Sequence, residues 1–152
     1  MEDSTRILKL REYLMGIIAT LNADYQQVNV NFLSNEIDNY SLDKIPEAST
    51  VEKWIAGVEL HRDVYSFRSR MNYSADVIDN IKNIGFFEKF EEKIRKKNKK
   101  KELPSITGIE SIICLNCGSM TNAETSTAEF DIQIQIEYRI GGQDETDSEV
   151  SM

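Results

Sequence analysis

The residue types that most often carry chemistry are scarce in this chain, which has only two cysteines and one histidine. Cys114 and Cys117 have the C-x-x-C spacing of zinc ligands or of a redox pair. A zinc site needs about four ligands, and His61 is the only histidine available. A redox pair is expected at the start of a helix, whereas this pair follows a predicted strand. Successive strand positions point to opposite faces, so we interpret the two cysteines as diverging structural thiols and predict no metal site.

Other kinds of catalysis find equally little support. Nucleophilic catalysis needs a nucleophile, a base and an orienting group held together, and His61 has only Arg62 and Asp63 beside it. The seven glycines are scattered, so no phosphate-binding or dinucleotide-binding loop is indicated. Carboxylates are plentiful but have no distinguishing spacing. We therefore predict no catalytic residue and no cofactor, and favour a structural or binding role over a small enzyme of unknown type.

Charge limits the range of partners. The net charge of -8 comes from 18 basic and 26 acidic side chains, which argues against broad nucleic-acid binding because such binding depends on phosphate neutralisation. One basic run stands out, and it is called the lysine run below: Lys96, Lys97, Lys99, Lys100 and Lys101. Positive charge is favourable at a helix C-terminus. The run is either a solvated helix end or an electrostatic contact with an acidic partner or DNA.

Apolar residues at helical spacing predict two helical regions. The first runs from a cap at Ser4 to Leu21, with this stripe: Ile7, Leu10, Leu14, Ile17, Ile18 and Leu21. The second begins after a cap at Ser74. Its stripes are Val77, Ile78, Ile81 and Ile84, and then Phe86, Phe87, Phe90 and Ile94. Because Gly85 separates the stripes, we predict one kinked helix or two consecutive helices.

Alternating patterns predict the strands. The predicted strands are Gln26–Leu33, Val51–Ala56, Val58–Tyr73, Ile106–Cys117 and Thr127–Ile140. In Val58–Tyr73 the apolar side changes near Asp63, so a β-bulge or a bend is expected there. Gly118–Ser126 is expected to be a hairpin connection. Thr127–Ile140 alternates throughout, which indicates one buried and one wet face in an antiparallel sheet.

These elements predict one α+β domain over residues 1–140, an antiparallel sheet with helices packed on one face. The following Gly141–Met152 is acidic and offers little to bury, so we expect a disordered tail. No apolar run approaches the roughly 18 residues of a membrane span, and the start of the chain has no signal-peptide pattern. We expect no membrane partner.

The segment Asn31–Pro46 is the most informative part of the chain. It is interpreted as too polar for a core strand, yet it carries regularly placed apolar residues: Phe32, Leu33, Ile37, Tyr40, Leu42 and Ile45. Such a segment is expected to lie pinned across a domain surface or against a neighbouring subunit. We therefore choose Asp38, Asn39 and Tyr40, together with the lysine run, as candidate interaction residues.

Several stretches within Arg6–Ile140 resemble one protein family. They are VNVNFLSNEIDNYSLDKIP, VYSFRSRMNYS and ADVIDNIKNIGFFEKFEEKI, followed by the closing alternating strand. Together they resemble the tail terminator (tail completion, "minor capsid") proteins of long-tailed phages, prophages and tail-like particles of Gram-positive bacteria. The resemblance implies a tail-terminator-like fold and a homo-oligomeric, typically hexameric ring.

The same resemblance implies a role in virion assembly. The ring would cap the tail tube, stop its polymerisation and meet the head connector, or the sheath in a contractile tail or bacteriocin. DNA would only pass through as cargo, and assembly would take place in the cytoplasm of the bacterial host. The alternative is a small nucleic-acid-binding accessory protein that uses Lys96–Lys101.

Overall fold

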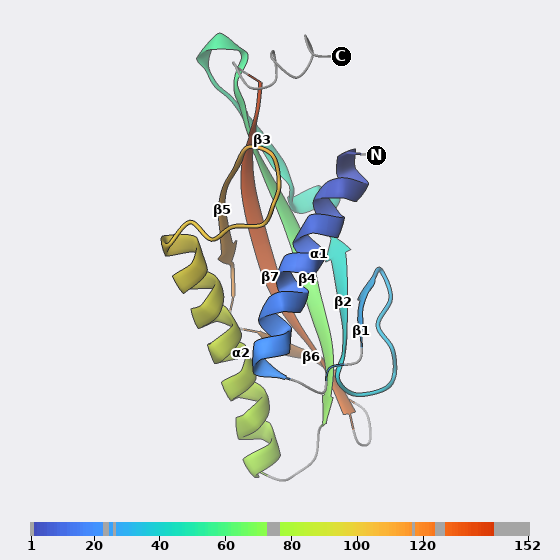
Figure 1. Ribbon diagram of the computed structural model, residues 1–152. Helices are drawn as coiled ribbons and strands as arrows, with labels where there is room; N and C mark the ends of the chain where they lie inside the picture. Colours follow the sequence, from blue (N-terminus) through green and yellow to red (C-terminus); the bar gives the residue numbers. More distant parts are fainter. Residues whose placement is uncertain are drawn as a thin grey trace.

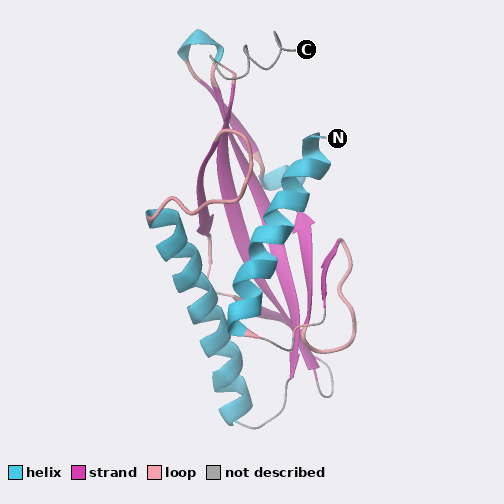
Figure 2. Cartoon of the chain, viewed as in Figure 1, coloured by secondary structure: helices cyan, strands magenta, loops and turns pink. Residues whose placement is uncertain are grey.

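The computed structural model describes residues 2–22, 25, 27–72, 77–116, 118–123 and 127–141. In this part of the chain, two α-helices accompany a seven-stranded sheet (Figures 1 and 2). The helices are α1 (Glu2–Leu21) and α2 (Val77–Lys99). The strands are β1 (Gln27–Val30), β2 (Asn39–Lys44), β3 (Thr50–Lys53), β4 (Glu59–Asn72), β5 (Ile109–Cys114), β6 (Ser119–Ala123) and β7 (Thr127–Ile140). Two 3-10 turns, η1 (Pro46–Ala48) and η2 (Ile55–Gly57), flank β3.

The sheet is mixed. Its strand order is β1-β2-β4-β7-β5, with β3 paired to β4 and β6 paired to β7. The β1–β2 pair is parallel, starting with Gln27 opposite Asn39, and the other pairs are antiparallel. The predicted α+β class is confirmed, but a purely antiparallel sheet was wrong. The reason is that the chain returns through residues 31–38 before β2 begins, so β2 runs in the same direction as β1.

Both helices cover the same face of the sheet, as predicted (Figure 1). The two helices and the facing strands share one apolar core. Its fully buried members from α1 are Leu10, Leu14, Ile17 and Ile18, and those from α2 are Phe90 and Ile94. The stripe predicted for the first helix is therefore confirmed. Its predicted cap is wrong, because α1 already begins at Glu2 and Ser4 lies within it.

The second helix is continuous through Gly85. Its predicted first stripe is wrong, since Ile81 and Ile84 are 61% and 58% exposed. Instead, Asn83 faces inward and its side-chain amide donates a hydrogen bond to the backbone oxygen of Asn72 (2.7 Å). The inward side of the helix thus carries Asn83, which is paired to the end of β4, while these isoleucines face outward. The predicted cap Ser74 lies outside the described residues, as do the side chains of Val77 and Ile78.

Strand β4 has no bulge at Asp63. Its register with β7 runs without a shift from Glu59 opposite Ile140 to Asn72 opposite Thr127. Asp63 stays on the helix-covered face because the hydroxyl of Tyr138 donates a hydrogen bond to its carboxylate (2.9 Å). A paired polar group needs no bend to take it out of the core.

Irregular pairing occurs instead on the other side of β7. The register shifts within β5 between Ile109 and Ser111, and within β6 between Met120 and Asn122. The strand predicted for Ile106–Cys117 is shorter, and the predicted connection Gly118–Ser126 contains strand β6. The alternation predicted for β7 is confirmed: its burial alternates from Thr127 to Tyr138. The predicted tail beyond Gly141 lies outside the described residues.

The prediction that Asn31–Pro46 is too polar for a core strand was wrong. Its second half is strand β2, which lies between β1 and β4 in the interior of the sheet. Tyr40 and Leu42 are 1% and 0% exposed and belong to the apolar core. Ser41 is fully buried as well. The pattern is that of an ordinary two-faced strand, whose polar side meets partners that lie far away in sequence.

Candidate interaction surfaces

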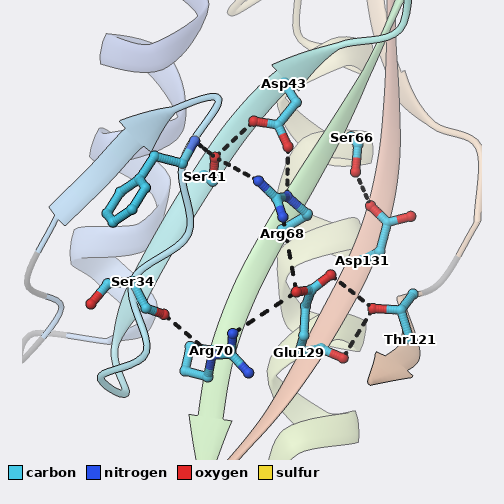
Figure 3. Close-up of polar contacts among 10 residues, drawn as sticks. Ser34, Ser41, Asp43, Ser66, Arg68, Arg70, Thr121, Glu129 and Asp131 are labelled. Atoms are coloured by element: carbon cyan, nitrogen blue, oxygen red, sulfur yellow. Dashed lines mark hydrogen bonds and ion pairs between the residues drawn. The ribbon is translucent and has the colours of Figure 1, made fainter. Parts of the chain in front are cut away.

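Ion pairs and hydrogen bonds cover the face of the sheet opposite the helices, which is called the helix-free face (Figure 3). Arg68 lies between Asp43 (2.5 Å) and Glu129 (3.9 Å), and Arg70 also reaches Glu129 (3.9 Å). The Ser66 hydroxyl donates a hydrogen bond to Asp131. These contacts join β2, β4 and β7 across the sheet. They account for the polar side of β2, because Asp43 is paired with a basic group on the neighbouring strand.

Residues 31–38, called the β1–β2 loop, are tied closely to the sheet. The backbone N–H of Phe32 donates to the Ser41 hydroxyl (3.0 Å), and the Arg70 guanidinium donates to the carbonyl of Ser34 (3.2 Å). Asn31 has a left-handed backbone with φ of 57°. The anchored backbone leaves the Phe32 side chain 61% exposed. A large aromatic group is thus presented at the β1 edge of the sheet on a fixed loop.

The three candidate residues of this segment lie mostly inside the fold. Asn39 and Tyr40 are 5% and 1% exposed. The Asn39 amide donates to the carbonyls of Glu36 and Ile37 (3.2 and 3.1 Å), so it shapes the end of the β1–β2 loop. Asp38 is partly buried, has a φ of 62°, and accepts a hydrogen bond from Asn22 (2.9 Å).

The exposed apolar side chain of the segment is therefore Phe32, which sequence reasoning did not select as a site residue. Phe32 and Tyr40 are both aromatic, and nothing local separates them. Alternation does not distinguish them either, because Phe32 continues the alternation of Val28 and Val30 just as Tyr40 alternates with Leu42. Phe32 stands beyond the end of β1.

Burial raises the pKa of Tyr40 to about 12, with the Asn22 hydrogen bond acting in the opposite direction and the Asp38 charge adding to it. Since the unfolded value is about 10, the neutral phenol stabilises the folded protein below about pH 10. We expect this contribution, about 2–3 kcal/mol, to be lost as the pH rises through the folded pKa. Urea unfolding of wild type and Tyr40→Phe between neutral pH and strongly alkaline pH measures it.

The variant should lose less stability over this alkaline range than wild type. Part of the loss should persist in Tyr40→Phe, because burial also raises the pKa of Tyr13, to about 12, and that of Tyr138. Parallel curves for the two proteins would contradict the assignment to Tyr40.

The lysine run lies where α2 ends, near the opposite edge of the sheet. Lys96 pairs with Glu92 (2.7 Å), and this hydrogen bond lowers the pKa of the Glu92 carboxyl. Lys97 lies 3.9 Å from Glu102, whose backbone oxygen accepts a hydrogen bond from Tyr13 (2.7 Å). The other three lysines are exposed: Lys99, Lys100 and Lys101. The run is therefore a concentrated positive surface held at a fixed helix end.

A hollow of about 260 Å³ lies between α2 and β5 and is called the α2–β5 hollow. Its lining combines apolar and charged groups: Glu91, Ile94, Arg95, Asn98, Ile113 and Cys114. The Asn98 side chain accepts a hydrogen bond from the backbone N–H of Ile112 (3.0 Å), which ties the helix to the strand. The hollow is smaller than the roughly 300–1,000 Å³ of small-molecule pockets. Its size suits one or two side chains of another protein.

His61 and Cys114 belong to the reactive residue types, and both contact neighbouring groups of the fold. The Nε2 atom of His61 lies 2.9 Å from Glu59, and its ring stacks on Tyr138 with centroids 5.2 Å apart. Cys114 is half-buried beside the α2–β5 hollow. Cys117 lies outside the described residues, so the predicted divergence of the two thiols stays a prediction. Among the described side chains, no group of three or more His, Cys, Asp or Glu is placed to hold a metal ion.

The comparisons add no family assignment. No protein-family model matches this chain, and no curated protein is significantly similar to it. Within the described ranges, neither helix has the length and apolar character needed to cross a membrane.

Proposed function

We propose that this chain is a tail terminator, a structural protein without catalytic activity. Copies of it form a ring, typically hexameric, that caps the tail tube of a long-tailed phage or a tail-like particle. The ring stops tube polymerisation and meets the head connector, or the sheath end in a contractile tail. Assembly takes place in the cytoplasm of the bacterial host, and the ring remains in the finished particle with DNA as passing cargo. The resemblance of Arg6–Ile140 to that family motivates the proposal.

The observation that best supports a ring is that the two edges of the sheet carry unlike surfaces. At the β1 edge, Phe32 and Val30 are 61% and 41% exposed. At the β5 edge lie the α2–β5 hollow and the lysine run, with Ile113 and Leu115 39% and 45% exposed. Closed rings need such a heterologous interface, in which one patch meets a different patch on the neighbouring copy.

A capping role predicts binding to one structure only, the end of a tail tube. We expect the purified protein to bind the ends of tubes from its own phage or particle, and not their sides. Weak contacts from each copy add when a ring meets a repeating tube end. Electron microscopy of labelled protein mixed with purified tubes measures this.

Deleting the protein should leave tails of uncontrolled length, or tails that do not join heads. A deletion strain that gives tails of normal length and yield would rule out the terminator role, as would protein that binds no tube end at any concentration.

The lysine run supports a second candidate, a small nucleic-acid-binding accessory protein. Its exposed lysines form a positive surface at the end of α2 in an otherwise acidic chain. If the protein binds nucleic acid through this run, its affinity for DNA should fall steeply as the salt concentration rises. The affinity should be lost when the lysines of the run are replaced by serine. The acidic balance of the chain favours the terminator proposal.

A further inference from the structure

The β1–β2 loop and the α2–β5 hollow have features of the two halves of one contact. Phe32 projects at the first edge of the sheet, and the hollow lies at the last strand of the opposite edge. Because they lie at opposite edges of one sheet, a second copy placed beside the first can bring them together. Repeating the same step generates a ring or an open chain of copies.

The shapes and polarity of the two surfaces correspond. A buried aromatic side chain removes about 150–250 Å² of surface from water, and Phe32 has most of its surface available. The hollow offers Ile94 and Ile113 as apolar walls, in a space too small for a typical cofactor or drug-sized ligand. An aromatic anchor in a small pocket is the typical centre of a protein interface, and the charged part of this lining, Glu91 and Arg95, would surround the anchor.

The charges correspond as well. Glu36 is exposed and Asp38 is partly exposed on the β1–β2 loop. Arg95 lines the hollow with a side chain that is 67% exposed and lies 3.7 Å from Glu91, and the lysine run follows it over the end of α2 and the two residues after it. An acidic loop beside Phe32 would therefore meet the longest run of basic residues in a chain whose net charge is -8. Complementary charge of this kind sets orientation and speeds encounter.

The backbone of the β1–β2 loop is already held in place in the single chain. Contacts from Ser41, Arg70 and Asn39 hold its backbone within the single chain. A side chain presented on a fixed backbone loses less conformational entropy when it docks. This explains why polar residues of β2 and β4 make so many bonds to a surface loop.

We propose that the β1–β2 loop of one copy docks in the α2–β5 hollow of the next, with Phe32 inserted against Ile113 and Cys114 of β5. Glu36 then faces Arg95 and the lysine run. This inference rests on the proposed function, since it specifies the contact between neighbouring subunits of the ring. It also unites the two candidate sets of the sequence, the Asn31–Pro46 segment and the lysine run, in one interface.

The test uses one variant for each half of the contact. Phe32→Ser removes the anchor but keeps the hollow, and Ile113→Glu blocks the hollow but keeps the anchor. We expect each variant alone to self-associate about tenfold or more weakly than wild type in sedimentation equilibrium. Ile81→Ser is the matched control, because Ile81 is 61% exposed on the same helix as the hollow but lies outside both surfaces. Its self-association should equal that of wild type.

Mixing the two variants gives the decisive result. Each mixed pair retains one intact anchor and one intact hollow, so the mixture should form heterodimers with near wild-type affinity that cannot grow further. A mixture that stays monomeric, or a wild-type chain that stays monomeric at its highest soluble concentration, overturns the proposed contact. Unchanged assembly of both variants overturns it too.

The outcomes separate this inference from the terminator proposal. If wild type caps purified tail tubes and Phe32→Ser does so equally well, the ring uses another contact and the terminator role stands. If the variants behave as expected in self-association but wild type binds no tube end, the contact stands and the terminator role fails. Circular dichroism and thermal unfolding should match wild type for all variants, since each changed side chain is exposed.

Discussion

Replacing Phe90 with alanine is expected to lower the free energy of unfolding by about 3–5 kcal/mol. Phe90 is 0% exposed, and its ring stacks near Phe67 and Phe86 with centroids 5.4 and 6.4 Å apart. Phe67 in turn stacks on Tyr40 at 5.5 Å. Truncation therefore leaves a cavity where α2 meets the middle of the sheet, and it removes aromatic contacts as well as buried area. Urea unfolding followed by far-ultraviolet circular dichroism measures the change.

Ile84→Ala is the control for this prediction. Ile84 lies on the same helix but is 58% exposed, although its apolar type and spacing resemble those of a core residue. Its replacement should change the free energy of unfolding by no more than about 0.5 kcal/mol, and alanine is the better helix former. A loss as large as that of Phe90→Ala would contradict this prediction, because it would mean that Ile84 is covered in the folded protein.

Phe90 and Ile84 show where the spacing of apolar residues in the sequence identifies the buried side chains and where it does not. In α1 and β7 one face is apolar throughout, so helical spacing and strict alternation identified the buried residues correctly. In α2 two apolar stripes compete over Val77–Ile94. The choice between them depends on Asn83 and its bond to the backbone of Asn72. That bond joins the end of β4 to α2, and the spacing of apolar residues in the sequence does not reveal it.

The same reasoning explains the misreading of β2 and of Asp63. Ser41 and Asp43 look too polar for an interior strand, but Arg68 of β4 pairs with Asp43 on the helix-free face. Asp63 looks like a break in the apolar pattern of β4, but the hydroxyl of Tyr138 on β7 donates a hydrogen bond to its carboxylate. A buried polar residue is acceptable when its partner is in place. Partners so distant in sequence cannot be identified from one sequence alone.

The candidate site was predicted in part. The sequence pointed to the Asn31–Pro46 segment and to the lysine run. The structure places the first half of that segment next to edge strand β1, its second half in interior strand β2, and the lysine run near the β5 edge. Within the segment, Tyr40 was chosen as an interaction residue and Phe32 was not. The sequence does not show which of the two side chains is exposed, because both are aromatic and both follow an asparagine. The α2–β5 hollow was not foreseen, since it lies where α2 packs beside the last strand and where Asn98 accepts a hydrogen bond from the backbone of β5.

Asp63→Ala is expected to destabilise the protein by about 2–3 kcal/mol. Asp63 is 4% exposed, accepts the hydrogen bond of Tyr138, and lies 3.7 Å from Lys44 and 4.0 Å from Arg6. Its loss leaves a buried phenol without its acceptor and two basic groups without their shared carboxylate. The cost is kept below that of a fully buried ion pair because the side chains of Arg6 and Lys44 are 18% and 35% exposed. Urea unfolding at neutral pH measures it.

A titration gives this prediction a second, independent readout. Burial raises the pKa of Tyr138, and the charge of Asp63 and its hydrogen bond raise it further. Asp63→Ala should therefore lower the pKa of Tyr138, as followed by phenolate absorbance, with Tyr138→Phe identifying which transition belongs to this residue. Asp63→Asn keeps an acceptor for the hydroxyl but removes the charge, so it should lie between wild type and Asp63→Ala in both stability and pKa.

Arg139→Ala is the matched surface control for the Asp63 series. Arg139 pairs with Glu110 at 2.7 Å, but both side chains are more than 40% exposed, at 44% and 42%. Exposed pairs contribute less than about 1 kcal/mol, so this variant should stay close to wild type at low salt and closer still at high salt. If Asp63→Ala proved equally mild, and Tyr138 kept its pKa, the carboxylate would not be the group that joins α1, β4 and β7.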